Sequence, residues 1–194
     1  MALKIKVRNR AGLGGLGSNL LSSLSAGGDE VFTIAEAAEV LGYNGAKLEK
    51  LLHDLCRNKW IERIERGKYL ILPLDAGPKA EHGTHPYLIA RKLAKPYYVG
   101  FASALNYHGI TEQVSRTTYI VMTKPKNQLS FHSEEFKFVC LGKERFFGFR
   151  EEWIGNLKFN ISEVEKTIVD CLFLPIYSGG ITEVVKALEK RWTT

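Results

Sequence analysis

Apolar positions in the first third of the chain follow the period of an α-helix. Leucines at 20–24 recur at helical spacing and precede a Gly-Gly pair, which is typical of a helix end. An apolar pair at 31–32 predicts a short strand, and Thr33 with Glu36 has the spacing of a capping box. A second, short helix is therefore expected, ending at Gly42.

The pattern then changes from a third helix to strands. Asn44 stands where it can cap a helix over 44–58, whose leucines form another apolar stripe. Two runs rich in aromatic and branched residues follow, at 60–65 and 68–73, with Gly67 in the turn between them. The order helix, strand, helix, turn, helix, hairpin is that of a winged helix-turn-helix, whose third helix enters the DNA major groove.

A Pro- and Gly-containing linker at 74–86 is expected to precede a second domain. Its patterns predict helices over 87–93, 102–109, 162–173 and 182–190, and strands over 97–101, 117–123, 128–131, 136–141, 146–149 and 158–161. The strands after 117 are expected to form a meander. The fold class is therefore α+β: a winged helix-turn-helix at 18–75, followed by an α/β domain with a mostly antiparallel sheet at 84–194.

The helix expected at 162–173 carries both apolar and charged residues. Its expected buried residues are Ile168, Val169 and Leu172. Asp170 either faces solvent or forms a salt bridge with Lys166 at the i, i+4 spacing of a helix.

Composition narrows the class of protein. The chain of 194 residues has a net charge of +6 and a sequence pI of about 9.2, which admits polyanionic partners. Three cysteines lie far apart with no CxxC pair, which argues against a zinc ribbon or a disulfide framework and fits a reducing cytoplasm. No apolar run is long enough to span a bilayer, and the first residues lack the apolar core of a secretory signal. We therefore expect a cytoplasmic protein without a membrane partner.

Candidate DNA-binding residues lie on the third helix and the hairpin. Two lysines are near the N-terminal end of the helix, where base edges are normally read, and the basic hairpin tip suits the phosphate backbone or the minor groove. The full set is Thr33, Asn44, Lys47, Lys50, His53, Arg57, Arg63, Arg66 and Lys68. Acidic residues lie among them, so the alternative is a set of solvated charges on a protein-interaction module that does not bind DNA.

Motifs for other chemistry are incomplete. GLGGLG at 12–17 satisfies the GxGxxG pattern, but no strand directly precedes it and no βαβ unit follows, so a flexible lead is expected there. His82 and His85 lack further ligands for a metal site, and Ser103 and His108 lack a third catalytic partner. The imidazole of His108 is instead expected to satisfy the carbonyl groups at the end of its own helix. We expect no cofactor, no metal and no enzymatic activity.

Three segments of the second domain, together with the N-terminal arrangement, resemble the AbiEi antitoxin family. They are YVGFASALNYHGIT at 98–111, TYIVMTK at 118–124 and ISEVEKTIVDCL at 161–172. The most specific pair of motifs joins Ser103, Ala104, Leu105, His108 and Gly109 with the segment 165–171. The likeness runs from about residue 18 to 190. AbiEi proteins are the antitoxin and transcriptional-regulator half of prokaryotic type IV toxin–antitoxin systems, which act in abortive infection.

The resemblance implies an N-terminal DNA-binding winged helix and a C-terminal domain needed for antitoxicity. It also implies autorepression through inverted repeats in the promoter. The implied functional partner is a nucleotidyltransferase-like toxin, counteracted without a stable complex. The chain departs from the family in its short C-terminal part. The expected function is a DNA-binding regulator, autorepressor and antitoxin; the alternatives are an antitoxin or protein-interaction module without DNA binding, and a plain regulator without a toxin.

Overall fold

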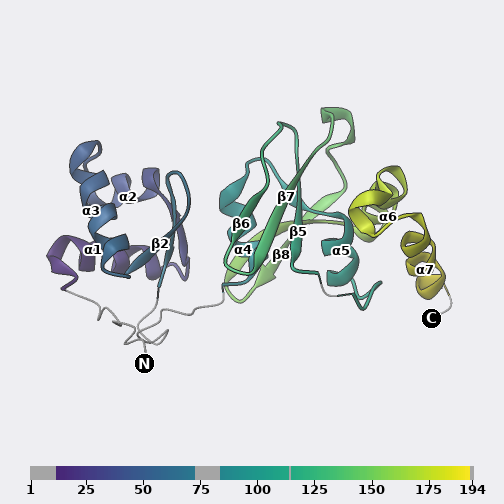
Figure 1. The fold of residues 1–194 in the computed structure, drawn as a ribbon, viewed down its shortest axis with the longest axis horizontal. Coiled ribbons are helices and arrows are strands. Elements are labelled where there is room, and N and C mark those ends of the chain that lie inside the picture. Colours follow the sequence, from purple (N-terminus) through teal and green to yellow (C-terminus); the bar gives the residue numbers. More distant parts are fainter. Residues whose placement is uncertain (1–11, 73–83, 114, 193–194) are drawn as a thin grey trace, which may run out of the picture. The chain divides into compact units, whose positions relative to one another are not determined.

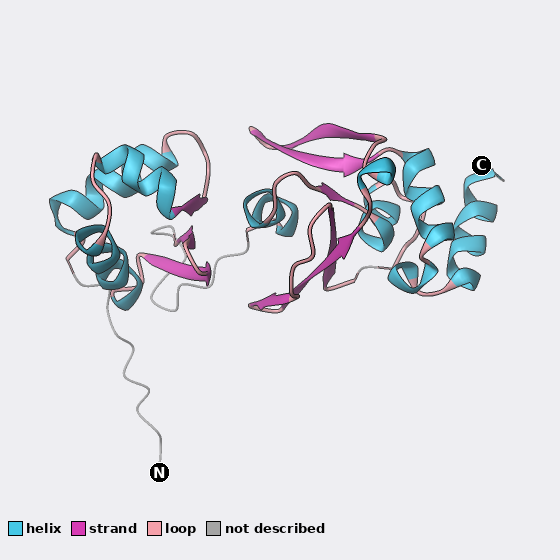
Figure 2. Ribbon diagram, turned by 90° about the horizontal axis from the view of Figure 1, so that it is seen from above, coloured by secondary structure: helices cyan, strands magenta, loops and turns pink. Residues whose placement is uncertain are grey.

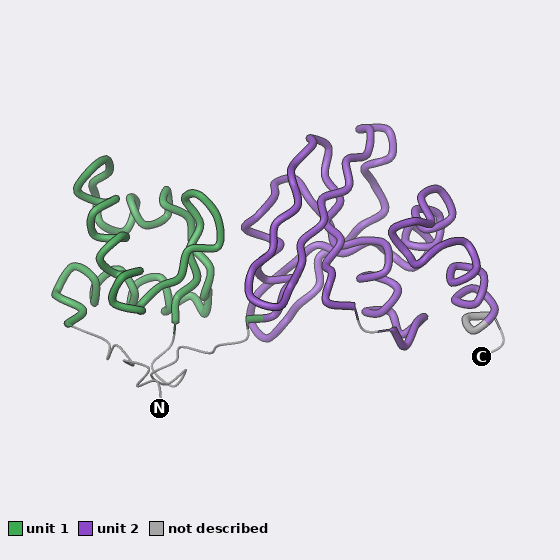
Figure 3. Tube along the Cα trace, viewed as in Figure 1, with its two compact units in different colours: residues 1–84 green, residues 85–194 purple. Residues whose placement is uncertain are grey.

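The computed structural model describes residues 12–72, 84–113 and 115–192. The chain divides into two compact units, residues 1–84 and 85–194 (Figure 3), and each has a hydrophobic core of its own. The first unit is mainly helical and the second contains a six-stranded sheet, so the predicted α+β fold class is confirmed. The linker expected at 74–86 falls mostly outside the described residues.

Three helices and a small sheet make up the first unit (Figure 1). Its elements are α1 (Gly14–Ser25), β1 (Val31–Thr33), α2 (Ile34–Leu41), α3 (Ala46–Arg57), β2 (Ile61–Glu65) and β3 (Lys68–Ile71). The strands are antiparallel in the order β1-β3-β2, with Phe32 opposite Tyr69. Leu20 of α1 and Leu48 and Leu52 of α3 share one core with Phe32. The order of elements is the one predicted for a winged helix-turn-helix.

Capping groups explain where α2 begins and ends. The Thr33 hydroxyl accepts a hydrogen bond from the Glu36 backbone N–H at 3.2 Å, and the Glu36 carboxylate accepts one from the Thr33 backbone N–H at 2.7 Å. The predicted capping box is thus confirmed. Gly42 ends α2 with a φ of 71°, which is costly for any residue with a Cβ. The prediction that Asn44 caps the third helix was wrong, because α3 begins at Ala46 with Gly45 as its N-cap and no side-chain cap.

Helix α1 begins earlier than the leucine stripe indicated. Residues 14–17, which were expected to be a flexible lead, form its first turn. Gly17 is buried, and a Cβ at this position would lie 3.0 Å from Cδ2 of Leu55 on α3. The expectation was wrong because glycine here permits close approach of two helices, which offsets its low helix propensity.

The second unit places a mixed six-stranded sheet beside a group of helices (Figure 2). Its strands are β4 (Tyr98–Val99), β5 (Thr117–Met122), β6 (Leu129–Phe131), β7 (Glu134–Cys140), β8 (Phe149–Ile154) and β9 (Leu157–Ser162). Its helices are α4 (Pro86–Leu93), α5 (Phe101–Tyr107), α6 (Val164–Phe173) and α7 (Ile181–Trp192), with 3₁₀ turns η2 (Lys143–Arg145) and η3 (Pro175–Ser178). Residues of α5, α6 and α7 pack against Tyr98 and Val121 of the sheet.

The strand order β6-β7-β5-β4-β9-β8 differs from the expected meander. Pairs β5–β7 and β4–β9 are parallel, and the other three neighbouring pairs are antiparallel. The meander was wrong because β6 occupies the edge and β7 returns alongside β5. The strand expected at 146–149 was also misplaced, since β8 begins at Phe149.

Helix α6 buries the face opposite to the expected one. Lys166, Thr167, Asp170 and Cys171 are its buried residues, whereas the side chains of Val169 and Leu172 are 57% and 46% exposed. Lys166 Nζ lies 2.6 Å from Asp170 Oδ1, so the salt-bridge alternative is confirmed, but inside the protein. Asp170 also accepts a hydrogen bond from the Tyr98 hydroxyl at 2.8 Å, which explains why charged residues occupy this face.

Candidate nucleic-acid interface

The exposed face of α3 carries the basic residues that the sequence analysis placed there. Lys47, Lys50, His53 and Arg57 are all exposed, while Leu48, Leu52 and Leu55 are buried on the opposite side. Lys47 Nζ lies 4.4 Å from the centre of the Tyr43 ring. Both lysines are in the first half of the helix, where its N-terminal end can approach a ligand.

An acidic neighbour partly neutralises the second half of α3. The Asp54 carboxylate lies 3.0 Å from Nη2 of Arg57 and 3.9 Å from Nδ1 of His53. The Arg57 side chain is 59% exposed, so the pair is well solvated and weak. Lys47 and Lys50 join no such ion pair within the described residues, although the exposed Glu49 lies between them in the first turn of α3.

The β2–β3 hairpin ends in a tight turn at Gly67, whose φ is 74°. Arg66 is exposed at this tip. Lys68 forms an ion pair of 2.7 Å with Glu65, and each of these side chains is 21% exposed. The Arg63 guanidinium donates to the Glu65 carbonyl at 3.3 Å. The hairpin thus presents Arg66 most openly, whereas Lys68 is held by a carboxylate.

A hollow of about 720 Å³ lies between α3 and the hairpin. It brings His53 of the helix together with Arg63 and Arg66 of the hairpin, and its lining also includes Glu49, Cys56 and Tyr69. Burial raises the pKa of the Cys56 thiol and of the Tyr69 hydroxyl, so both groups stay protonated at neutral pH. The hollow therefore combines cationic and neutral donors with one carboxylate.

Not every predicted residue takes part in this surface. Thr33 uses its hydroxyl in the capping box, where it also lies 3.0 Å from the Glu36 carboxylate. Asn44 is exposed in the turn before α3. Sequence reasoning missed Tyr43 and Tyr69; the Tyr43 hydroxyl is buried without a hydrogen-bond partner among the described residues. Tyr43 could have been found from the sequence, because it is an aromatic residue in the turn before the basic helix.

The other motifs have structural roles in the described parts of the chain. His85 caps α4, with its Nδ1 accepting from the Tyr87 backbone N–H at 3.2 Å, while His82 lies outside the described residues. His108 Nε2 lies 2.8 Å from the Ser162 carbonyl, so it joins the end of α5 to the end of β9 rather than satisfying its own helix. The Ser103 hydroxyl accepts from the Tyr119 backbone N–H at 2.9 Å. No cluster of three metal-ligating side chains occurs in the described parts of the chain.

None of the described helices combines the length and apolar character that a bilayer span requires.

The Lys166–Asp170 pair is the most deeply buried ion pair found in the described residues, with side chains 5% and 3% exposed. Burial and the adjacent Asp170 carboxylate together raise the pKa of Tyr98 far above its ordinary value. Its hydroxyl therefore remains a hydrogen-bond donor to that carboxylate.

Comparison with known proteins gives a similarity in fold and a match to a family model. No curated protein matches the chain. The crystal structure of the RV2827C protein from Mycobacterium tuberculosis is similar in fold, with a TM-score of 0.61 and 15% sequence identity over 92% of this chain and 67% of that chain.

The family match falls on the first unit. Residues 19–71 match the family model described as a transcriptional regulator, AbiEi antitoxin. The segments 98–111 and 161–172, which carried the most specific motifs, lie outside this match. The predicted resemblance to the AbiEi antitoxin transcriptional regulators is therefore confirmed over the residues that contain α2, α3 and the β2–β3 hairpin.

Proposed function

We propose that the first unit binds double-stranded DNA and that the chain acts as a sequence-specific transcriptional regulator. The observation that carries this proposal is the hollow shared by α3 and the hairpin tip, with His53, Arg63 and Arg66 on its walls. The family match over residues 19–71 supports the regulatory role.

Helix α3 and the hairpin have different tasks in this proposal. Lys47 and Lys50, near the N-terminal end of α3, meet base edges in the major groove, where lysine binds guanine acceptors. Arg66 meets phosphate groups, which supplies affinity without base selectivity. The ion pairs of Asp54 and Glu65 reduce the net positive charge of the surface, which limits binding to random DNA.

The test is a titration of the promoter fragment upstream of the gene, followed by gel shift. Replacing Lys47 and Lys50 with alanine should weaken specific binding by about 1–3 kcal/mol for each lost base contact. Lys143→Ala, which removes an exposed positive charge from the second unit, is the matched control and should leave the affinity unchanged. Unchanged affinity of the double variant would refute the assignment of α3 as the recognition helix.

The hairpin is tested through salt dependence. Arg66→Ala should weaken binding to promoter and random DNA alike, and it should lower the slope of log affinity against log salt concentration by about one. Loss of promoter preference with an unchanged slope would mean that Arg66 reads bases.

We extend the proposal to autorepression through inverted repeats in the promoter and to an antitoxin role against a nucleotidyltransferase-like toxin. Both rest on the AbiEi resemblance. Co-expression of the toxin with the full chain, and with the full chain carrying the Lys47 and Lys50 substitutions, separates the two activities. Rescue of growth by both proteins would assign antitoxicity outside the DNA-binding surface. Rescue by neither, with both proteins folded, would leave a plain regulator.

A further inference from the structure

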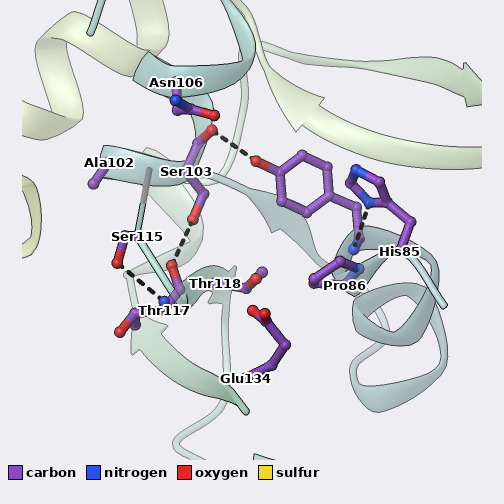
Figure 4. Close-up of a pocket in the computed structure, with 10 residues that line it drawn as sticks. His85, Pro86, Ala102, Ser103, Asn106, Ser115, Thr117, Thr118 and Glu134 are labelled. Carbon is purple, nitrogen blue, oxygen red and sulfur yellow. Dashed lines mark hydrogen bonds between the residues drawn. The ribbon is translucent and has the colours of Figure 1, made fainter. Parts of the chain in front are cut away.

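The second unit contains a hollow of about 190 Å³ where the start of α4, helix α5 and strands β5 and β7 meet (Figure 4). All of its lining residues belong to this unit. In Figure 4 the Glu134 carboxylate points toward Thr118. Tyr87 is also one of the lining residues. The AbiEi resemblance over residues 19–71 does not extend to this region.

Two polar side chains in the hollow, Thr118 and Glu134, form no side-chain hydrogen bond or ion pair with the described residues. Thr118 is paired with Phe136 across the β5–β7 ladder, and Glu134 stands two residues before Phe136, so Glu134 and Thr118 point to the same face of the sheet. Thr118 is only 3% exposed, and its hydroxyl forms no hydrogen bond within the described residues. Glu134 is half-buried and joins no ion pair within the same residues. The Thr118 hydroxyl and the Glu134 carboxylate can therefore each accept a hydrogen bond from a ligand in the hollow.

No other described residue lining the hollow supplies a positive charge to Glu134. The Ser103 hydroxyl accepts from the Tyr119 N–H and donates to the Thr117 carbonyl, and the Tyr87 hydroxyl donates to the Ser103 carbonyl at 2.9 Å. Burial lowers the pKa of His85, so its ring is neutral at pH 7. Glu134 is therefore the one charged residue among those lining the hollow.

We propose that this hollow binds a compact organic cation that carries an ammonium group. The ammonium N–H groups donate to the Glu134 carboxylate and to the Thr118 hydroxyl, and the ligand's carbon chain lies against the Tyr87 ring. An apolar cavity of about 150 Å³ holds benzene, so a hollow of about 190 Å³ suits a ligand of roughly eight non-hydrogen atoms. This site is independent of the proposed DNA-binding surface.

Isothermal titration of the full chain with putrescine tests the site, and 1,4-butanediol is the uncharged control of similar shape. We expect saturable binding of putrescine and none of butanediol. Glu134→Gln keeps the side-chain shape, removes the charge and should weaken binding at least about tenfold. Glu135→Gln is the matched control because Glu135 is exposed on the opposite face, 3.9 Å from Lys137, and it should bind as the unchanged chain does.

Thr118→Val removes the hydroxyl while keeping the side-chain shape, and it should weaken putrescine binding several-fold. Thermal melting of each variant establishes that it is folded. Equal binding by the Glu134→Gln and Glu135→Gln variants would overturn the proposal. Absence of saturable binding for putrescine, histamine and agmatine at about 10 mM would overturn it as well.

Discussion

Breaking the buried Lys166–Asp170 pair is expected to destabilise the second unit more than any surface change. Lys166→Met removes the ammonium group that lies 2.6 Å from Asp170 and donates to the Arg145 carbonyl at 2.8 Å. The Asp170 side chain is 3% exposed, so its charge would remain buried, and among the described residues the Tyr98 hydroxyl would be its one remaining polar partner. Removal of one member of a buried ion pair costs about 3–5 kcal/mol of unfolding free energy.

Further variants measure how much Lys166, Asp170 and Tyr98 each contribute to the unfolding free energy. Tyr98→Phe removes one hydrogen bond to a charged acceptor and should cost about 1.5–3 kcal/mol. The double change Lys166→Met with Asp170→Leu removes both charges, so its remaining loss is that of the unpaired Tyr98 hydroxyl, about 1–3 kcal/mol. The double variant should therefore be more stable than Lys166→Met alone.

Urea unfolding measures these differences, and hydrogen exchange read by mass spectrometry assigns them to a unit. Exchange in peptides of residues 85–194 should accelerate, while peptides of residues 12–72 serve as the internal control. At roughly 4 °C for each kcal/mol in a domain of this size, Lys166→Met should lower the melting temperature by about 12–20 °C. A loss below about 1 kcal/mol, or a double variant no more stable than Lys166→Met, would refute the reasoning.

The same network has an expected pH dependence. Burial and the Asp170 carboxylate raise the pKa of Tyr98 above its ordinary value of 10.0, so the folded state binds this proton more tightly than the unfolded state does. The contribution is fully present below pH 10 and is lost as the pH rises toward the folded-state pKa. Tyr98→Phe should therefore reduce the loss of stability at alkaline pH, and urea titrations at pH 8 and 10.5 measure this.

Three further outcomes are expected. Gly15→Ala should stabilise the first unit by about 0.5–1 kcal/mol, because a Cβ at this position meets nothing within 4 Å. Gly17→Ala should destabilise the first unit, because a Cβ there would lie 3.0 Å from Leu55. Thermal melting compares the two variants. Asp54→Asn should tighten promoter binding and steepen its salt dependence, because it removes a negative charge from α3, and the gel shift above measures this. In thiol labelling of the folded chain, exposed Cys140 should react first, and Cys171 should react only after unfolding, because burial raises its pKa to about 12.

Local signals predicted much of the first unit. The capping box at Thr33 and the glycine turn at Gly67 act over a few residues, so their sequence patterns are sufficient. The start of α1 could not be predicted, because the reason for Gly17 is a side chain 38 positions later, Leu55. A glycine-rich stretch has the same composition whether it is a loop or a close helix contact.

The second unit shows where local patterns are insufficient. Val169 and Leu172 have the spacing of a buried stripe, but the buried face of α6 carries Lys166 and Asp170 because Tyr98 completes their hydrogen bonds. Strand order depends on pairings between distant segments, which alternation along one strand does not encode. On the candidate DNA surface, helical phase predicted the exposure of Lys47 and Lys50, but it did not reveal that the Lys68 side chain is held by Glu65.

The tip of the hairpin is attached to the start of α2 rather than free. The Ile34 backbone N–H at the start of α2 donates to the Gly67 carbonyl at 2.8 Å, and β1 pairs with β3 directly beside this bond. The separation of Arg66 from α3 is thus set before any ligand arrives. The conformational entropy of positioning the hairpin is lost during folding rather than during association. The proposed DNA-binding surface therefore has a fixed spacing between the hairpin tip and α3. This spacing should favour DNA whose groove width already matches it and disfavour sequences that must be deformed to fit.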